Sequence, residues 1–177
     1  MSLPMKFRKV NDEVYYTTES VTKVGWDVVA WLKEKASGNP RQRVRLCTHP
    51  DSDDLLHEML IVHARNAYVR PHRHPTKSES FHMIEGELSV LIFSGDGSVQ
   101  EHIGMSSQHP DRPFYYRLSK PLYHTVVPHS DFVVFHETTN GPFRREDMEF
   151  APWSPAEDAD PAAQQAYLAN LFGGQTP

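Results

Sequence analysis

Residues 68–86 read YVRPHRHPTKSESFHMIEG, and this stretch carries the pattern that decides the fold. His72 and His74 are two residues apart, a spacing that places both imidazoles on the same face of a β-strand. Residues 75–78 are typical of a turn, and Glu79 begins a second extended run. A hairpin at this turn would bring Glu79 opposite the two histidines. Two imidazoles and a carboxylate are suitable ligands for a divalent metal ion, so we expect a metal site here.

The same spacing resembles the first motif of the cupins, in which His-x-His is followed after four residues by Glu and after six more by Gly. The matching residues are His72, His74, Glu79 and Gly86. Cupins are small antiparallel β-barrels, and a histidine in a second motif downstream supplies a fourth metal ligand. The resemblance implies that His124, in the segment PLYHTV, is this ligand. The sequence departs from the cupin pattern at Asn66, where a glycine is usual, and in the turn before His124, which lacks a glycine.

Four further segments make the chain similar to the WbuC-type cupin-fold metalloproteins, a family associated with bacterial O-antigen and polysaccharide gene clusters. These segments are residues 45–50, 57–61, 77–82 and 132–139. The resemblance covers roughly two-thirds of the chain. It implies an all-β, cupin-type antiparallel β-barrel (a double-stranded β-helix or jelly roll) and a homodimer. It also implies one divalent metal ion, for which mixed nitrogen and oxygen ligation does not choose among Fe, Mn, Ni and Zn.

Composition limits the functional classes. The chain has 177 residues, enough for one domain with a substantial core. Its net charge of −5 argues against a broad nucleic-acid surface. Cys47 is the single cysteine, so an internal disulfide is excluded, as is common in a reducing compartment. Residues 1–10 lack the apolar stretch typical of a secretory leader, and no apolar run approaches membrane length. We therefore expect a cytoplasmic protein that binds a small molecule and neither nucleic acid nor membrane.

The pattern along the chain predicts one domain in three parts. Residues 1–40 contain an arm up to about Glu19 and a helix from Ser20 to about Lys35. The apolar stripe of this helix would consist of Val21, Val24, Val28, Trp31 and Leu32. Residues 41–145 form the barrel. Residues 146–177 form a tail with a short helix that starts at Asp160 or Pro161 and ends at Gly173-Gly174.

Within the barrel, short period-two runs separated by turn residues predict strands and exclude alternating βαβ units. The predicted strands begin near Arg41 and continue through residues 57–65, the two motif strands, 88–93, 99–103, 114–118, 123–127 and 132–138. Residues 94–98, which read SGDGS, predict a hairpin turn, and residues 104–112 predict a polar loop.

Three residues are candidates for contact with a substrate. Arg70 would share the face of His72 and could bind a carboxylate or phosphate. Tyr116 could donate a hydrogen bond or carry a proton. His136 alternates with Phe132 and Val134, which could place it inside the barrel. For Arg70 and Tyr116, barrel packing and surface ion pairing are at least as good an interpretation.

The other histidines singled out in the sequence are expected to lie outside the set of metal ligands. His82 lies three residues from Glu79, so on a regular strand it faces the opposite side and stays out of the metal site. For His49, His57 and His63, a structural hydrogen-bonding role is the better interpretation than metal ligation.

Together these patterns favour a metal-dependent enzyme that acts on a small oxygenated molecule such as a sugar derivative. The sugar, and a role in polysaccharide (O-antigen) biosynthesis, follow only from the WbuC resemblance. Two alternatives stay open: a metal-dependent dioxygenase, and a non-catalytic module that binds a metal or a sugar.

Overall fold

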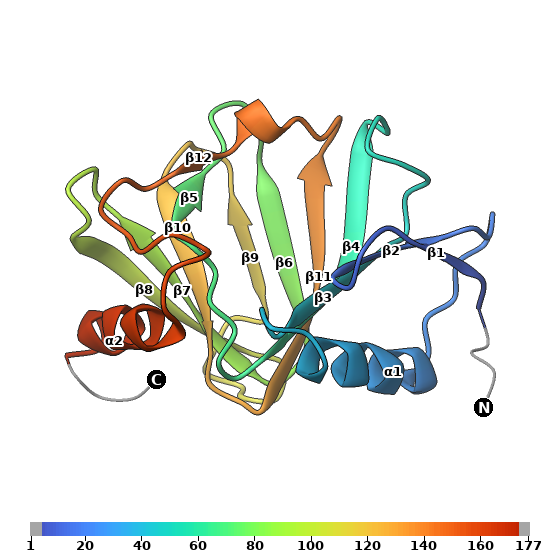
Figure 1. Ribbon diagram of the computed structural model, residues 1–177, viewed down its shortest axis with the longest axis horizontal. Coiled ribbons are helices and arrows are strands. Elements are labelled where there is room, and N and C mark those ends of the chain that lie inside the picture. Colours follow the sequence, from blue (N-terminus) through green and yellow to red (C-terminus); the bar gives the residue numbers. More distant parts are fainter. Residues whose placement is uncertain (1–4, 174–177) are drawn as a thin grey trace.

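The computed structural model describes residues 5–173, which form two facing β-sheets and two α-helices (Figure 1). The first sheet contains, in spatial order, β1 (Phe7–Lys9), β2 (Val14–Thr17), β3 (Arg43–Cys47), β4 (Leu56–Ala64), β11 (Phe132–Asn140), β6 (Glu79–Glu85) and β9 (Tyr115–Leu118). The second sheet contains β12 (Glu149–Phe150), β5 (His72–Arg73), β10 (Tyr123–Pro128), β7 (Glu87–Phe93) and β8 (Val99–Ser106).

The order of the strands from β4 to β11 is that of a jelly roll. The chain crosses between the sheets so that β4, β11, β6 and β9 lie side by side in the first sheet, opposite β5, β10, β7 and β8 in the second. The pairs within these two sets are antiparallel. The predicted all-β jelly-roll fold is therefore confirmed, as two facing sheets rather than one closed barrel.

The predicted hairpin between the two motif strands is wrong. β5 pairs with β10 and β12 in the second sheet, whereas β6 pairs with β11 and β9 in the first. Residues 74–78 therefore form an arch between the sheets. Turn residues such as proline and serine bend the chain in either case and do not specify where the next strand pairs. Glu79 reaches the histidines across the space between the sheets.

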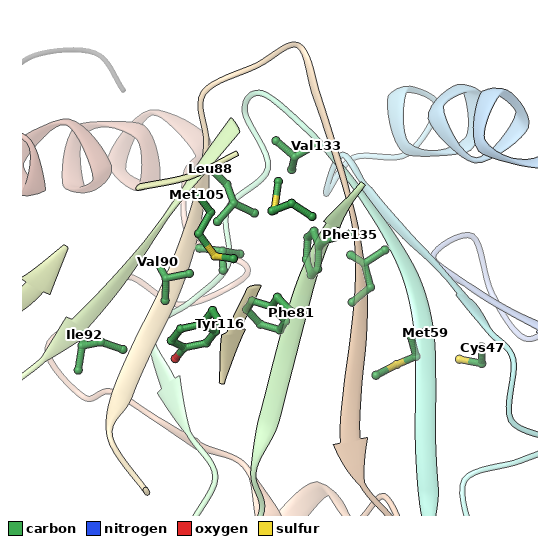
Figure 2. Close-up of a cluster of buried hydrophobic side chains, with 13 residues drawn as sticks. Cys47, Met59, Phe81, Leu88, Val90, Ile92, Met105, Tyr116, Val133 and Phe135 are labelled. Atoms are coloured by element: carbon green, nitrogen blue, oxygen red, sulfur yellow. The ribbon is translucent and has the colours of Figure 1, made fainter. Parts of the chain in front are cut away.

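Apolar side chains fill one end of the space between the sheets. A single cluster joins Phe81, Val90, Met105, Val133 and Phe135 with their neighbours from both sheets (Figure 2). The turn between β10 and β11 closes this end of the space between the sheets (Figure 2). Gly86, between β6 and β7, has φ of +81°, and a Cβ there would collide with the backbone of β11. The opposite end of the same space is polar, and the candidate site lies there.

The two helices cover the outer faces of the sheets. α1 (Trp26–Ser37) packs Val28, Leu32 and Ala36 on the outer side of β3 and β4. α2 (Pro161–Leu171), capped by Asp160, packs Leu168 on the outer side of the second sheet. Figure 1 shows them at opposite flanks of the molecule. The start predicted for α2 is confirmed, and Gly174 lies outside the described residues.

The N-cap predicted for α1, Ser20, is wrong by five residues. Val21 and Val24 precede the helix and are exposed, and Gly25 is its N-cap. Glycine costs about 1 kcal/mol inside a helix, which favours a boundary at this position. The expected N-terminal arm is also wrong, because residues 7–17 form the hairpin of β1 and β2. β2 runs parallel to β3. β8 extends to Ser106, into the predicted polar loop.

A 3-10 turn, η1 (Arg145–Asp147), and β12 return the chain over the polar end of the sandwich (Figure 1). Within residues 5–173, neither α-helix has the length and apolar character needed to cross a membrane.

Candidate metal centre

Strand pairing brings three histidines together at the polar end of the sandwich. His72 on β5 is the direct antiparallel partner of His124 on β10. His74 follows β5 immediately and lies on the same side as His72. The ring nitrogens that the three histidines offer all lie within 4.8 Å of one another. The described residues therefore contain a histidine cluster of a size that could hold one metal ion.

Glu79 completes the cluster from the other sheet. It is the first residue of β6, and its carboxylate points at the histidines across the space between the sheets. Oε1 lies 2.8 Å from Nε2 of His124, and Oε2 lies 3.5 Å from Nε2 of His74. The four residues that the sequence indicated as ligands are thus adjacent in space.

Backbone carbonyls orient the three imidazoles. Nδ1 of His72 donates to the carbonyl of Arg70 at 2.8 Å, and Nδ1 of His124 donates to that of Leu122 at 3.0 Å. Nδ1 of His74 points at the carbonyl of Asp147 at 3.4 Å. A hydrogen bond at Nδ1 fixes the tautomer and leaves Nε2 with a free lone pair, the usual arrangement of metal-binding histidines.

Two of the candidate metal-ligating atoms are buried and lack partners. Glu79 is 4% exposed and His124 is 1% exposed. Neither Oε1 of Glu79 nor Nε2 of His124 has a well-oriented hydrogen bond within residues 5–173, although the two atoms are close. Buried polar atoms are rarely left unpaired in folded proteins. Three oriented Nε2 atoms and one carboxylate therefore fit a divalent metal ion.

The protonation of the metal-free cluster follows from burial and from Glu79. Burial, followed by the charge of His124, lowers the pKa of His72 to about 3, so this imidazole is neutral. Burial also opposes a charge on His124, but the Glu79 carboxylate outweighs it and raises the His124 pKa. Burial would raise the pKa of Glu79, yet His124 and His74 hold it well below its usual range. Glu79 is thus ionised and ready to bind a cation.

The three candidate substrate contacts lie in different places. Arg70 lines the cavity beside the histidines, but its guanidinium binds the carbonyl of Ala151 at 3.1 Å and stacks on Phe150. Tyr116 lies in the apolar core, where its hydroxyl has no partner among the described residues (Figure 2). Burial, together with the charge of Glu79, raises the pKa of Tyr116 and keeps it a neutral phenol.

The expected place of His136 in the pocket is wrong. On β11, Val133 and Phe135 face the other sheet, whereas Val134 faces α1. His136 shares the face of Val134, and its Nε2 lies 3.7 Å from Glu58 outside the cavity. His82 is exposed on the outer side of β6, packed near Phe114, as its spacing from Glu79 predicts.

The residue that sequence reasoning missed is Glu137. It follows His136 on β11 and lines the cavity. Burial, together with the charge of Glu79, raises its pKa to about 8, so the carboxyl is mostly protonated at neutral pH. The signal that could have found it is the parity of Val133, Phe135 and Glu137, had that face of β11 been assigned to the interior.

Among the other histidines, His49 has the expected structural role, because its Nδ1 accepts from the backbone N–H of Glu58 at 3.2 Å. His57 stacks on His49 with ring centroids 4.0 Å apart. His57 and His63 differ from the expectation, since Nε2 of His57 and Nδ1 of His63 are both buried without a hydrogen-bond partner among the described residues. All three line the cavity.

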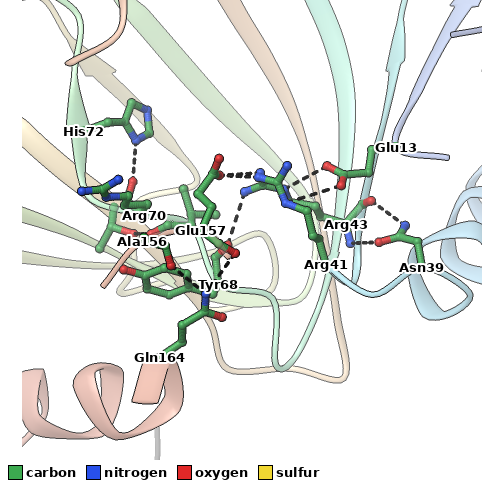
Figure 3. A network of polar contacts seen from close by, with 12 residues as sticks. Glu13, Asn39, Arg41, Arg43, Tyr68, Arg70, His72, Ala156, Glu157 and Gln164 are labelled. Carbon is green, nitrogen blue, oxygen red and sulfur yellow. Dashed lines mark hydrogen bonds and ion pairs between the residues drawn. The ribbon is translucent and has the colours of Figure 1, made fainter. Parts of the chain in front are cut away.

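The cavity between the sheets has a volume of about 440 Å³. The histidine cluster forms one end, and the arginines of the β3 side, Arg41, Arg43 and Arg45, line the other. Glu13 and Glu157 approach these arginines from two distant segments of the chain (Figure 3). The volume is sufficient for a small-molecule ligand.

Comparison with known proteins gives a partial family match. The model of a domain family of unknown function, DUF6016, matches residues 26–105. This range runs from α1 to β8 and includes His72, His74 and Glu79, but not His124. No protein of curated function matches the sequence.

Similar solved structures include cupin proteins. A protein of Shewanella oneidensis is 14% identical, with 71% of this chain and 73% of that chain covered and a TM-score of 0.49. The cupin domain of Schizosaccharomyces pombe Cnp3 is 11% identical over 56% and 64% of the two chains, with a TM-score of 0.44. A sugar phosphate isomerase of the cupin superfamily from Silicibacter pomeroyi is 16% identical over 50% and 52%, with a TM-score of 0.40. None of these similarities bears on the chemistry of the site.

Proposed function

We propose that this protein holds one divalent metal ion with His72, His74, Glu79 and His124 and acts on a small oxygenated molecule bound in the adjoining cavity. The observation that carries the proposal is the convergence of these four side chains, with buried atoms of Glu79 and His124 left unpaired, at the wall of a 440 Å³ cavity. A closed structural site would have no need of a cavity, whereas a site that acts on a ligand does.

The bound ion would act as a Lewis acid toward a hydroxyl or carbonyl oxygen of the ligand. The residues of the chain would supply orientation and protons. Glu137 lines the same cavity, and burial together with the charge of Glu79 raises its pKa to about 8 in the metal-free protein, so it is the carboxyl placed to exchange a proton with a ligand there. Arg70 is fixed by Ala151 and Phe150, so it would shape the cavity wall beside His72 rather than move with a ligand.

A sugar derivative is the ligand class that we favour, in bacterial polysaccharide biosynthesis, because of the resemblance to WbuC-type proteins. A cytoplasmic location and a homodimer are retained as proposals on the single cysteine and on the same resemblance, respectively. Two alternatives are a metal-dependent dioxygenase, which the same ligand set would serve with iron, and a non-catalytic binding module. The presence of Glu137 beside the cluster favours a reaction over simple binding, since a titratable group near neutral pH suits proton transfer.

Elemental analysis of protein purified without added metal tests the proposal. We expect about one equivalent of a single transition metal per chain. The metal found then directs the assay: with ferrous protein, ligand-dependent oxygen consumption would favour the dioxygenase, and its absence would favour isomerisation or hydrolysis. A protein that neither contains nor takes up a transition metal would contradict the proposal.

A further inference from the structure

The β3 end of the cavity is strongly cationic. The inner face of β3 carries Arg43, Arg45 and Cys47, while Val44 and Leu46 pack under α1 on the outer face. Arg41 lies just before the strand. Three guanidinium groups from five residues thus line one wall, and burying several like charges requires either carboxylates or a bound anion to offset them.

Two of the three arginines are already paired. Arg43 binds Glu13 at 3.3 Å and Glu157 at 2.8 Å. Arg41 also pairs with Glu13 and Glu157, so two carboxylates are shared between two guanidinium groups (Figure 3). The charges of these four side chains cancel, and this part of the wall is complete without a ligand.

Arg45 is not paired in this way. Unlike its two neighbours, its guanidinium forms no ion pair or side-chain hydrogen bond within residues 5–173, yet the side chain is half-buried and lines the cavity. Two carboxyls of the cavity wall lie near enough for its charge to lower their pKa, Glu13 and Glu137, but neither forms an ion pair with its guanidinium. Arg45 is therefore a half-buried cation at the cavity wall without an ion-pair partner among the described residues.

His63 provides a second, independent observation. It lies on β4, opposite Arg43 and diagonal to Arg45, and is 6% exposed. The residue lines the cavity, and its Nδ1 is buried without a hydrogen-bond partner among the described residues. Burial, followed by the charges of Arg45 and Arg41, lowers its pKa to about 3, so it is a neutral imidazole that can donate one hydrogen bond. A buried polar atom without a partner indicates a missing ligand or water.

We propose that Arg45 and His63 form a subsite for an anionic group, a carboxylate or a phosphate monoester, on the ligand whose oxygen atoms bind at the histidine cluster. Guanidinium groups suit both anions because their N–H groups match two oxygens at once. The inference rests on the proposed function, which it deepens by defining the substrate class.

The spacing of the two ends sets an upper limit on the size of the ligand. The backbone carbonyl of Tyr68 accepts a hydrogen bond from Arg43 at 3.3 Å, and Tyr68 lies four positions before His72. An extended chain of four residues spans at most about 14 Å, so these two points of the cavity wall lie no further apart than that. A sugar acid or sugar phosphate of hexose size, with its anionic group at one end, fits within this limit.

Calorimetric titration of the metal-loaded protein tests this subsite. The probes are glucose 6-phosphate, gluconate and glucose, with inorganic phosphate as a competitor. The variants are Arg45→Gln, Arg45→Lys as the charge-retaining control, and Arg65→Gln as a control at an exposed arginine. Metal content and melting temperature are measured on every sample, so that loss of metal or of fold is recognised separately.

We expect an anionic sugar to bind wild type at least tenfold more tightly than glucose. Arg45→Gln should weaken it about 10- to 100-fold, the cost of one charged hydrogen-bonded contact, and leave glucose unchanged. Arg65→Gln should bind the anionic sugar as tightly as wild type does. The affinity of Arg45→Lys for it should lie between those of wild type and Arg45→Gln. The phosphate and carboxylate probes identify which anion is preferred.

Equal binding of anionic and neutral sugars by a fully metal-loaded wild type, or an Arg45→Gln variant that retains the anion preference, would overturn the subsite and leave the proposed function standing. A wild type that takes up no metal would contradict the proposed function instead.

Discussion

The two ends of the cavity are built on opposite principles. At the histidine end, donor atoms from both sheets converge and two of them, on Glu79 and His124, lack a well-oriented partner within residues 5–173. At the arginine end, Arg41 and Arg43 are matched by carboxylates of remote segments. The unpaired atoms of the histidine end need a bound ion, which the chain does not provide. At the arginine end, the carboxylates of the chain itself pair with two of the three arginines. Loss of a side chain should therefore affect ligand binding at the first end, whereas loss of a paired arginine or of its carboxylate partner should affect folding stability at the second.

The largest effect is expected from the histidine end. His72→Ala, His74→Ala and Glu79→Ala should each weaken metal binding by more than about 100-fold, because second-shell changes alone typically cost 10- to 100-fold. Elemental analysis after dialysis measures the retained metal. His82→Ala is the matched control, because His82 lies on the outer side of β6, the strand that carries Glu79, and this variant should retain a full equivalent. Equal losses in His82→Ala and His74→Ala would show that the register of β6 is wrong.

Removal of the metal should have the next largest effect. A metal bound only by the folded state, at several hundred to a thousand times its Kd, adds roughly 3–4 kcal/mol to the free energy of unfolding. For a chain of this length, chelation should lower the melting temperature by about 10 °C. The protein should remain folded at 25 °C, because its apolar core lies at the other end of the sandwich. Complete unfolding on chelation at 25 °C would instead indicate a structural metal.

A pH-dependent effect is expected between the two ends, at Glu137. Its pKa is raised from 4.5 to about 8 in the folded protein, so the unfolded chain loses this proton first as the pH rises. The contribution of Glu137 to stability is thus greatest below pH 4.5 and is lost progressively toward pH 8. In the metal-free protein, Glu137→Gln should raise the melting temperature at pH 8 and have little effect at pH 5.

The control for this measurement is Glu101→Gln, at an exposed carboxylate on β8. This substitution should leave the melting temperature unchanged at both pH 5 and pH 8. If Glu137→Gln changed the melting temperature by the same amount at pH 5 and at pH 8, the Glu137 carboxyl would be ionised in the folded protein at both pH values.

The smallest effect is expected at the arginine end. Glu157→Gln removes one of the two carboxylates shared by Arg41 and Arg43, which are partly exposed, and should cost about 1 kcal/mol. Thermal denaturation should show a decrease of about 2–4 °C. Glu149→Gln, at the more exposed pair with Arg73, should have no measurable effect. If both substitutions were neutral, the tail would be held mainly by its apolar contacts.

The sequence predicted the residues of the site better than the path of the chain between them. Spacing placed His72 and His74 on one face and His82 on the other, since a strand has a fixed period of two. It did not reveal that β5 and β6 pair in different sheets, because the same turn residues serve a hairpin and an arch. Pairing partners are set by contacts across the whole jelly roll, which a local pattern does not contain.

The assignment of His136 instead of Glu137 has a related cause. Residues 132–135 read FVVF, an unbroken apolar run, because β11 is covered by α1 on one side and by the second sheet on the other. Strands buried on both faces lose the alternation of polar and apolar residues that identifies the inner face. The prediction of where α1 begins was wrong for a similar reason. Packing of α1 on β3 and β4, rather than local propensity, determines where the helix begins.

The most direct test of the central claim is a crystal structure of the protein loaded with the metal found by elemental analysis, with the ion located by its anomalous scattering. The account predicts one ion per chain, bound by Nε2 of His72, His74 and His124 and by the carboxylate of Glu79, with one or two non-protein ligands facing the cavity. An ion bound elsewhere, or a tetrahedral site closed by four protein ligands and sealed from the cavity, would contradict it.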